Sequence, residues 1–150
     1  MKLARFLLVL LTLSFLANCA SARFEKDWKT AVAGFESETT DPVSGPWTGK
    51  WTTETNGHTG DLRCLVSPAK ASDDAYQFRY HATWSKIFKG GYTTEYDVKK
   101  SGSGYTVKGS KDLGIFGDFS HDGKIKGDTF NAQYEASTGD KGGFFMKRPQ

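Results

Sequence analysis

The chain has 150 residues, of which 25% are charged and 14% aromatic, and its formal net charge is +3. This length accommodates one domain with a sizeable core, and 17 glycines together with the aromatic content favour short strands and tight turns over a helical bundle. Acidic and basic residues are interspersed along the chain, which argues against the clustered basic surface that a nucleic-acid-binding protein needs.

Residues 1–22 have the pattern of an export signal. Lys2 and Arg5 precede an apolar run, and the segment ends in Ala20-Ser21-Ala22, which is typical of a signal-peptide cleavage site. The apolar run is about 11 residues long, well short of the roughly 20 that a membrane-spanning helix needs. We therefore expect a protein that is exported to the periplasm or the extracellular space and begins at Arg23, with a net charge near +1 once Lys2 and Arg5 are removed.

A second cleavage site remains an alternative. Leu16-Ala17-Asn18-Cys19 resembles a bacterial lipobox, in which the cysteine is lipidated and anchors the protein to the envelope. In the product that begins at Arg23, Cys19 is removed, so Cys64 is alone and cannot form an internal disulfide. It alternates in step with Leu62 and Val66, which predicts a buried core position.

Residues 23–44 are predicted to form an amphipathic helix and a linker. Apolar residues recur at helical spacing from Phe24 through Trp28 and Val32 to Phe35. The helix is therefore expected over residues 24–35. The linker that follows contains two prolines and leads into the third segment, residues 45–150.

The segment 45–60, GPWTGKWTTETNGHTG, predicts the first strand and its turn. Trp47, Gly49 and Trp51 alternate with polar residues, which is typical of a strand with one face on a core and one in water. Asn56-Gly57 is a strong hairpin signal because both residues tolerate positive φ. The chain is expected to reverse here.

Similar alternation predicts seven more strands, joined mostly by tight turns. Asp122-Gly123 is interpreted as another two-residue hairpin turn, and residues 85–91 as a connection. The predicted strands cover residues 61–67, 75–84, 92–99, 105–111, 115–121, 124–135 and 143–148. This spacing favours an all-β fold, an antiparallel up-and-down eight-stranded barrel, with a two-sheet sandwich as the second choice.

Gly45, Trp47 and Arg148 resemble the short signature of the calycin group, the lipocalins and their relatives. Those barrels open with a Gly-x-Trp strand after a short N-terminal helix, and an arginine near the last strand packs over the tryptophan. The resemblance implies that Arg148 covers Trp47 and closes one end of the barrel. The topology of an eight-stranded meander independently brings these two residues to the same end.

The opposite end is the predicted ligand mouth. Aromatic residues would line the interior, and loops at residues 85–91 and 113–117 would place apolar side chains beside lysines, with the ligand entering between them. The alternative is that Ile87, Phe88 and Phe116 fold inward as plugs. The predicted ligand-binding residues are Trp51, Tyr80, Trp84, Ile87, Phe88, Tyr92, Tyr96, Phe116, Phe119 and Tyr134.

No catalytic, metal or cofactor motif is apparent in the sequence. His58, His81 and His121 are expected to be solvated and do not have the spacing of metal ligands, and there is no nucleophile elbow or phosphate loop. We expect a non-enzymatic exported protein that binds a small apolar or amphipathic ligand.

The alternative is an envelope-associated structural or interaction barrel with a packed core, which would contact a partner or the membrane through Ile87, Phe88 and the N-terminal helix. Membrane contact is otherwise expected only through a lipidated Cys19 or inserted apolar loops. The sequence indicates neither a cofactor nor an oligomeric state.

Overall fold

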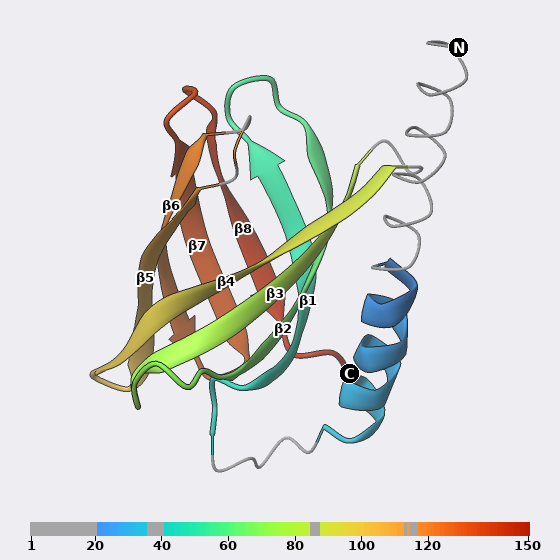
Figure 1. Ribbon diagram of the computed structural model, residues 1–150, viewed down its shortest axis with the longest axis vertical. Helices are drawn as coiled ribbons and strands as arrows, with labels where there is room; N and C mark the ends of the chain where they lie inside the picture. The colour runs from blue at the N-terminus through green and yellow to red at the C-terminus, as the bar shows by residue number, and fades with distance from the viewer. Residues whose placement is uncertain (1–20, 36–40, 85–87, 113, 115–116) are drawn as a thin grey trace, which may run out of the picture.

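The computed structural model describes residues 21–35, 41–84, 88–112, 114 and 117–150. Within these residues eight antiparallel strands follow one another around a closed barrel, and the last strand pairs with the first (Figure 1). The strands are β1 (Gly45–Thr53), β2 (Thr59–Pro68), β3 (Ala75–Trp84), β4 (Phe88–Ser101), β5 (Gly104–Asp112), β6 (Asp118–Lys126), β7 (Thr129–Ala136) and β8 (Lys141–Lys147). The predicted up-and-down barrel is confirmed, and the two-sheet sandwich is excluded.

Alternation along the strands determines which side chains enter the barrel. In β3 the side chains of Phe78 and Tyr80 are buried in the interior. Gln77 lies in the same strand, pairs with β2 and β4 on its two sides, and exposes its side chain on the outer surface. β3 has the bounds that the sequence predicts. Cys64 is a free cysteine buried in the core, as predicted.

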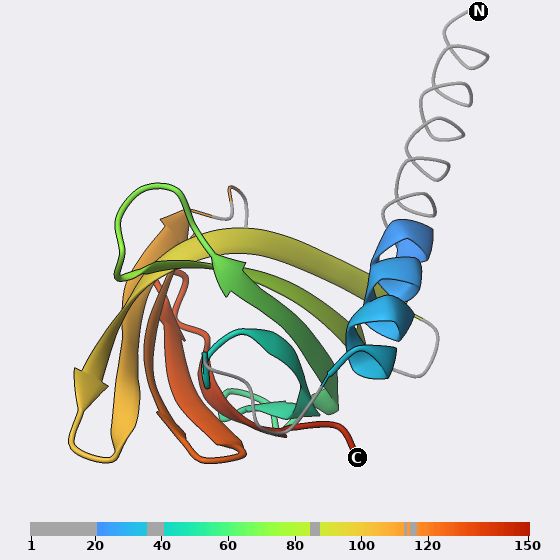
Figure 2. The ribbon, with the colours of Figure 1, turned by 90° about the horizontal axis from the view of Figure 1, so that it is seen from below.

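The N-terminal helix, residues 21–33, lies against the outer wall of the barrel (Figure 2). Phe24 is buried, and its ring stacks on that of His81 with the centroids 4.6 Å apart. Glu25 pairs with Arg63 of β2 and Asp27 with Arg79 of β3. The helix therefore covers outward-facing residues of β2 and β3, and the predicted boundary between residues 22 and 23 falls inside it.

The predicted turn at Asp122-Gly123 is wrong, because both residues lie inside β6. A Cβ on Gly123 would lie 2.9 Å from the ring of Phe130, so this glycine permits close packing inside the barrel. The chain reverses instead near Gly127, which has a φ of 52°. Accordingly β6 runs to Lys126, and β7 begins at Thr129 instead of residue 124.

The start of β4 and the start of β6 also differ from those predicted. Residues 88–91 belong to β4 and not to a connection, because Gly91 pairs with His81 of β3. A Cβ on Gly91 would lie 2.2 Å from the carbonyl oxygen of Tyr80, so glycine lets the two strands approach closely here. β6 begins at Asp118, three residues later than predicted.

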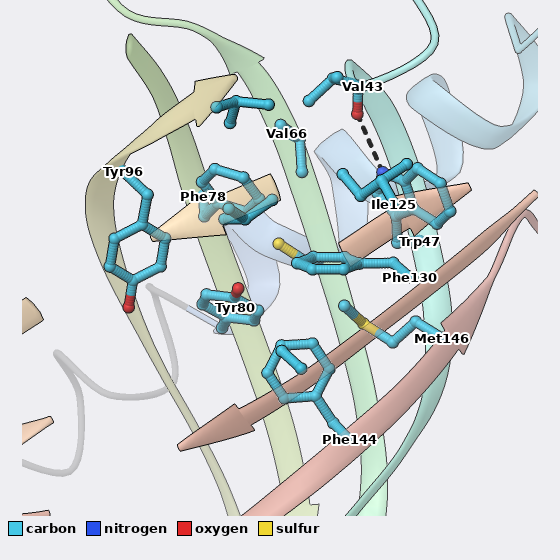
Figure 3. Packing of buried hydrophobic residues seen from close by; sticks show 14 of the residues in the cluster. Val43, Trp47, Val66, Phe78, Tyr80, Tyr96, Ile125, Phe130, Phe144 and Met146 are labelled. Atoms are coloured by element: carbon cyan, nitrogen blue, oxygen red, sulfur yellow. Dashed lines mark hydrogen bonds between the residues drawn. The ribbon is translucent and has the colours of Figure 1, made fainter. Parts of the chain in front are cut away.

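The end of the barrel near the chain's C-terminus is filled by side chains (Figure 3). Trp47 is fully buried, donates a hydrogen bond from Nε1 to the Val43 carbonyl at 3.0 Å, and packs edge-on against Phe130. The cluster also contains Val66, Phe78, Val98, Val107, Ile125 and Met146. This packed end resembles the interior of an ordinary globular core.

Arg148 covers the packed end from outside. Its guanidinium carbon lies 3.6 Å from the ring centroid of Trp47, and its nitrogens donate to the carbonyls of Pro46 (3.1 Å) and Pro42 (2.6 Å). Burial lowers the pKa of Arg148 to about 10, which leaves the guanidinium charged at neutral pH. The structure thus places Arg148 over Trp47, the arrangement that the resemblance to calycins implies.

Candidate ligand cavity

The opposite half of the barrel contains a cavity of about 360 Å³. This size lies within the range of roughly 300–1,000 Å³ that is usual for small-molecule sites. Its walls are mostly aromatic or aliphatic and come from several strands: Trp51, Leu62, Tyr80, Ala82, Gly91, Tyr92, Phe119, His121, Tyr134, Asp140 and Phe144. The barrel is therefore packed at one end and hollow at the other.

His121 is a polar residue of the cavity wall. Its side chain points inward from β6, where its Nε2 lies 3.2 Å from the Tyr92 hydroxyl and its Nδ1 hydrogen-bonds with the Tyr96 hydroxyl. Burial lowers the pKa of His121 to about 4, because the imidazolium form would lose its hydration. At neutral pH the ring is uncharged and can donate one hydrogen bond and accept another.

Tyr80 separates the hollow half from the packed half. Its ring lies 5.1 Å from that of Tyr92 and 5.8 Å from that of Phe144, measured between centroids, and the latter pair is edge-on. Its hydroxyl is buried and makes no hydrogen bond within the described residues, and burial raises its pKa well above the ordinary value. The tyrosine therefore acts here as an aromatic wall and stays protonated.

Asp140 lies at the rim of the cavity, in the turn before β8. Its Oδ1 accepts hydrogen bonds from the hydroxyls of Thr53 and Thr55, the latter at 2.9 Å. Its Oδ2 lies 3.5 Å from the Tyr134 hydroxyl. These contacts fix one carboxylate between the ends of β1 and β7.

The structure brings part of the predicted site together. The cavity wall contains Trp51, Tyr80, Tyr92, Phe119 and Tyr134, whereas Tyr96 is buried beside the cavity and reaches it through His121. Trp84 and Phe88 pair as backbone neighbours of β3 and β4. Their side chains lie outside the described part of the chain, as do Ile87, Phe116 and Cys19.

The sequence does not predict the remaining residues of the cavity wall. His121 is predicted to be solvated at a strand end, and this is wrong: it is 7% exposed and lies in the middle of β6. His81 is also buried rather than solvated, because the N-terminal helix covers it. His121 has the same inward parity as Phe119 and Ile125. With the turn at Gly127 instead of Asp122-Gly123, this parity predicts that His121 points into the barrel.

The described residues show neither a metal-binding cluster nor a membrane-spanning helix. They contain no cluster of three or more His, Cys, Asp or Glu side chains that could hold a metal ion. Nor do they contain a helix long and apolar enough to cross a membrane.

Comparison with known proteins identifies the fold alone. No family model and no curated protein matches the chain. Among solved structures, the chain is similar to a redesigned β-barrel, with 17% identity, a TM-score of 0.54, and coverage of 72% of this chain and 92% of that one. It is also similar to a de novo designed fluorescence-activating β-barrel, with 14% identity, a TM-score of 0.51, and coverage of 72% and 94%. By these likenesses the chain has the fold of an eight-stranded antiparallel β-barrel.

Proposed function

We propose that this protein is an exported, non-enzymatic, calycin-like binding protein that holds one small apolar or amphipathic molecule in the hollow half of its barrel. The observation that supports this most strongly is the cavity of about 360 Å³ between aromatic walls. Small eight-stranded barrels either fill their interior with side chains or hold one small ligand. Here the filled half supplies stability and leaves the other half for binding.

The division of the barrel supports the same proposal. Trp47 and Phe130 are fully buried in the packed end. That end therefore forms a close-packed core without side chains that would have to fill the hollow half. An apolar molecule that enters the cavity would remove further aromatic surface from water, at roughly 25 cal/mol per Å². The export pattern in residues 1–22 and the Gly45, Trp47 and Arg148 signature support the exported and calycin-like parts of the proposal.

Native and denaturing mass spectrometry of protein purified from its own host tests the proposal. A native mass that exceeds the denatured mass by that of a small molecule is expected. The denatured mass also reads the N-terminus, since a chain that begins at Arg23 supports cleavage after Ala22, and a lipidated Cys19 supports the envelope-anchored alternative.

Filling the cavity provides the matched test. Ala82 lines the cavity, so Ala82→Phe should abolish the extra mass, whereas Ala71→Phe, at an exposed position between β2 and β3, should retain it. A native protein without extra mass, which also fails to change its tryptophan fluorescence with fatty acids, retinoids, haem or quinones, would favour the packed interaction barrel instead.

A further inference from the structure

The charge at the cavity rim limits which ligands fit. Asp140 is fixed through Oδ1 by Thr53 and Thr55, while Oδ2 receives, from the described residues, one long contact of 3.5 Å from Tyr134. Within the same residues Asp140 forms no ion pair. An ionised carboxylate accepts several hydrogen bonds, so Oδ2 can accept a further donor from a ligand.

The rest of the described cavity wall carries no opposing charge. The lining contains neither lysine nor arginine, and its imidazole, that of His121, is neutral because burial lowers its pKa to about 4. Lys141, the residue after Asp140, pairs instead with Glu54 at 3.7 Å. Asp140 is therefore the one charged side chain among the described residues that line the cavity.

The aromatic walls near Asp140 suit a cation. Tyr134, whose hydroxyl contacts the carboxylate, stacks with Phe119 at a centroid distance of 5.6 Å, and Trp51 lines the same cavity. Aromatic faces attract ammonium groups, most strongly where water is partly excluded. Both features would disfavour a carboxylate, since an anion there would face Asp140 and the electron-rich rings.

We propose that the cavity selects an organic cation, an apolar amine whose ammonium group binds Asp140 at the rim and whose hydrocarbon body lies between Tyr80, Tyr92 and Phe144. This inference rests on the proposed ligand-binding function and names the class of ligand. It assigns Asp140 as the residue that determines specificity, and it places fatty acids among the poor ligands.

Three ligands of equal chain length test the proposal. Calorimetric or fluorescence titration of the full chain with decylamine, decanol and decanoate at neutral pH compares positive, neutral and negative head groups on one body. We expect decylamine to bind about tenfold more tightly than decanol, equivalent to about 1.4 kcal/mol, and decanoate to bind most weakly. Raising NaCl from about 0.1 to about 1 M should weaken decylamine alone.

A pair of charge-neutralising variants then assigns the effect to one residue. Asp140→Asn retains an acceptor for Thr53 and Thr55 and should lower decylamine affinity about tenfold without changing decanol binding. Asp61→Asn makes the same charge change on the outer face, where Asp61 pairs with Lys50, and should leave all three affinities unchanged. Urea unfolding of both variants checks that they fold.

The outcomes separate this proposal from the one on which it rests. Equal or tighter binding of decanoate, or an equal loss of all three ligands in Asp140→Asn, overturns the selection for cations but leaves the binding function. Binding of none of the three overturns the selection for cations, and the native mass then decides the binding function by itself. If Asp140→Asn does not fold, the head-group order and its salt dependence in the natural chain still decide the matter.

Discussion

His121 is a titratable side chain buried next to the cavity in the neutral form. The Tyr92 and Tyr96 hydroxyls flank its two ring nitrogens, and desolvation lowers its pKa to about 4 from an ordinary value of 6.5. The unfolded chain therefore binds a proton at higher pH than the folded protein does. Folding stability must fall as the pH drops through this interval.

The pH dependence can be assigned with His121→Gln, which cannot titrate. We expect the natural protein to lose up to about 3 kcal/mol of unfolding free energy through His121 as the pH falls from about 6.5 to about 4. The glutamine variant should lose correspondingly less. Urea melts of both proteins at each end of this interval measure the difference. Parallel losses would show that His121 does not contribute, since the pKa of His81 is lowered in both proteins.

At the scale of one element, Phe24 is the buried side chain of the N-terminal helix. Phe24 is 4% exposed, and the side chains of Arg63 and Arg79 lie over its ring with their guanidinium carbons 5.3 and 5.2 Å from its centroid. The same two arginines form the ion pairs to Glu25 and Asp27, which remain partly open to solvent. A buried aromatic ring contributes more than an ion pair that is partly open to solvent, so we expect Phe24 to contribute most to the docking of the helix.

Two substitutions in the helix should therefore differ in effect. Phe24→Ala should weaken the docking of the helix by about 3 kcal/mol and increase amide hydrogen exchange across residues 21–33. Asp27→Asn removes one ion pair from the same helix and should change this exchange little. Hydrogen exchange with mass spectrometry gives both readings, and similar effects of the two substitutions would contradict the assignment.

The sequence predicts these elements well where alternation is uninterrupted. The predicted bounds of β3 match the observed ones because apolar and polar residues alternate from Tyr76 to Trp84. The prediction failed at Asp122-Gly123, because a dipeptide that favours a turn can also lie in a strand when packing against Phe130 requires glycine. Local turn chemistry could not reveal that tertiary requirement, and the true turn near Gly127 carried a weaker signal.

For the whole molecule, the main feature is a barrel divided into a packed and a hollow half. Phe130 lies fully buried in the packed half, and its ring contacts those of Trp47 and Phe78. Phe119 lines the cavity and is partly exposed. The two residues are chemically identical but occupy environments of different density, so they report on the two halves separately.

Truncation of each phenylalanine to alanine tests the division. Phe130→Ala should cost about 3–5 kcal/mol, because it leaves a new cavity in a close-packed region. Phe119→Ala should cost less than about 1.5 kcal/mol, because it enlarges a cavity that already exists and removes less buried surface. Urea denaturation of both variants measures the costs, and equal values would show that the barrel is filled throughout.

The cavity was predicted in part. Parity placed Trp51, Tyr80, Tyr92, Phe119 and Tyr134 inside the barrel, and the structure places all of them in its wall. Asp140 was missed because its role depends on the turn before β8, which brings it to Thr53 across 87 residues of sequence. Strand periodicity describes the interior of a strand and contains no information on where loop residues lie.

The pairing of β1 with β8 imposes an order on folding. Every other neighbouring pair in the ring joins strands that are consecutive in the chain, whereas Thr48 and Lys147 must meet across almost the whole barrel sequence. Such long-range pairing is slow, and until it forms, both end strands expose unpaired edges that can join another chain. The cavity does not exist before this step. A ligand can therefore bind only after the ring has closed, and it should prolong the lifetime of the folded protein without hastening its assembly.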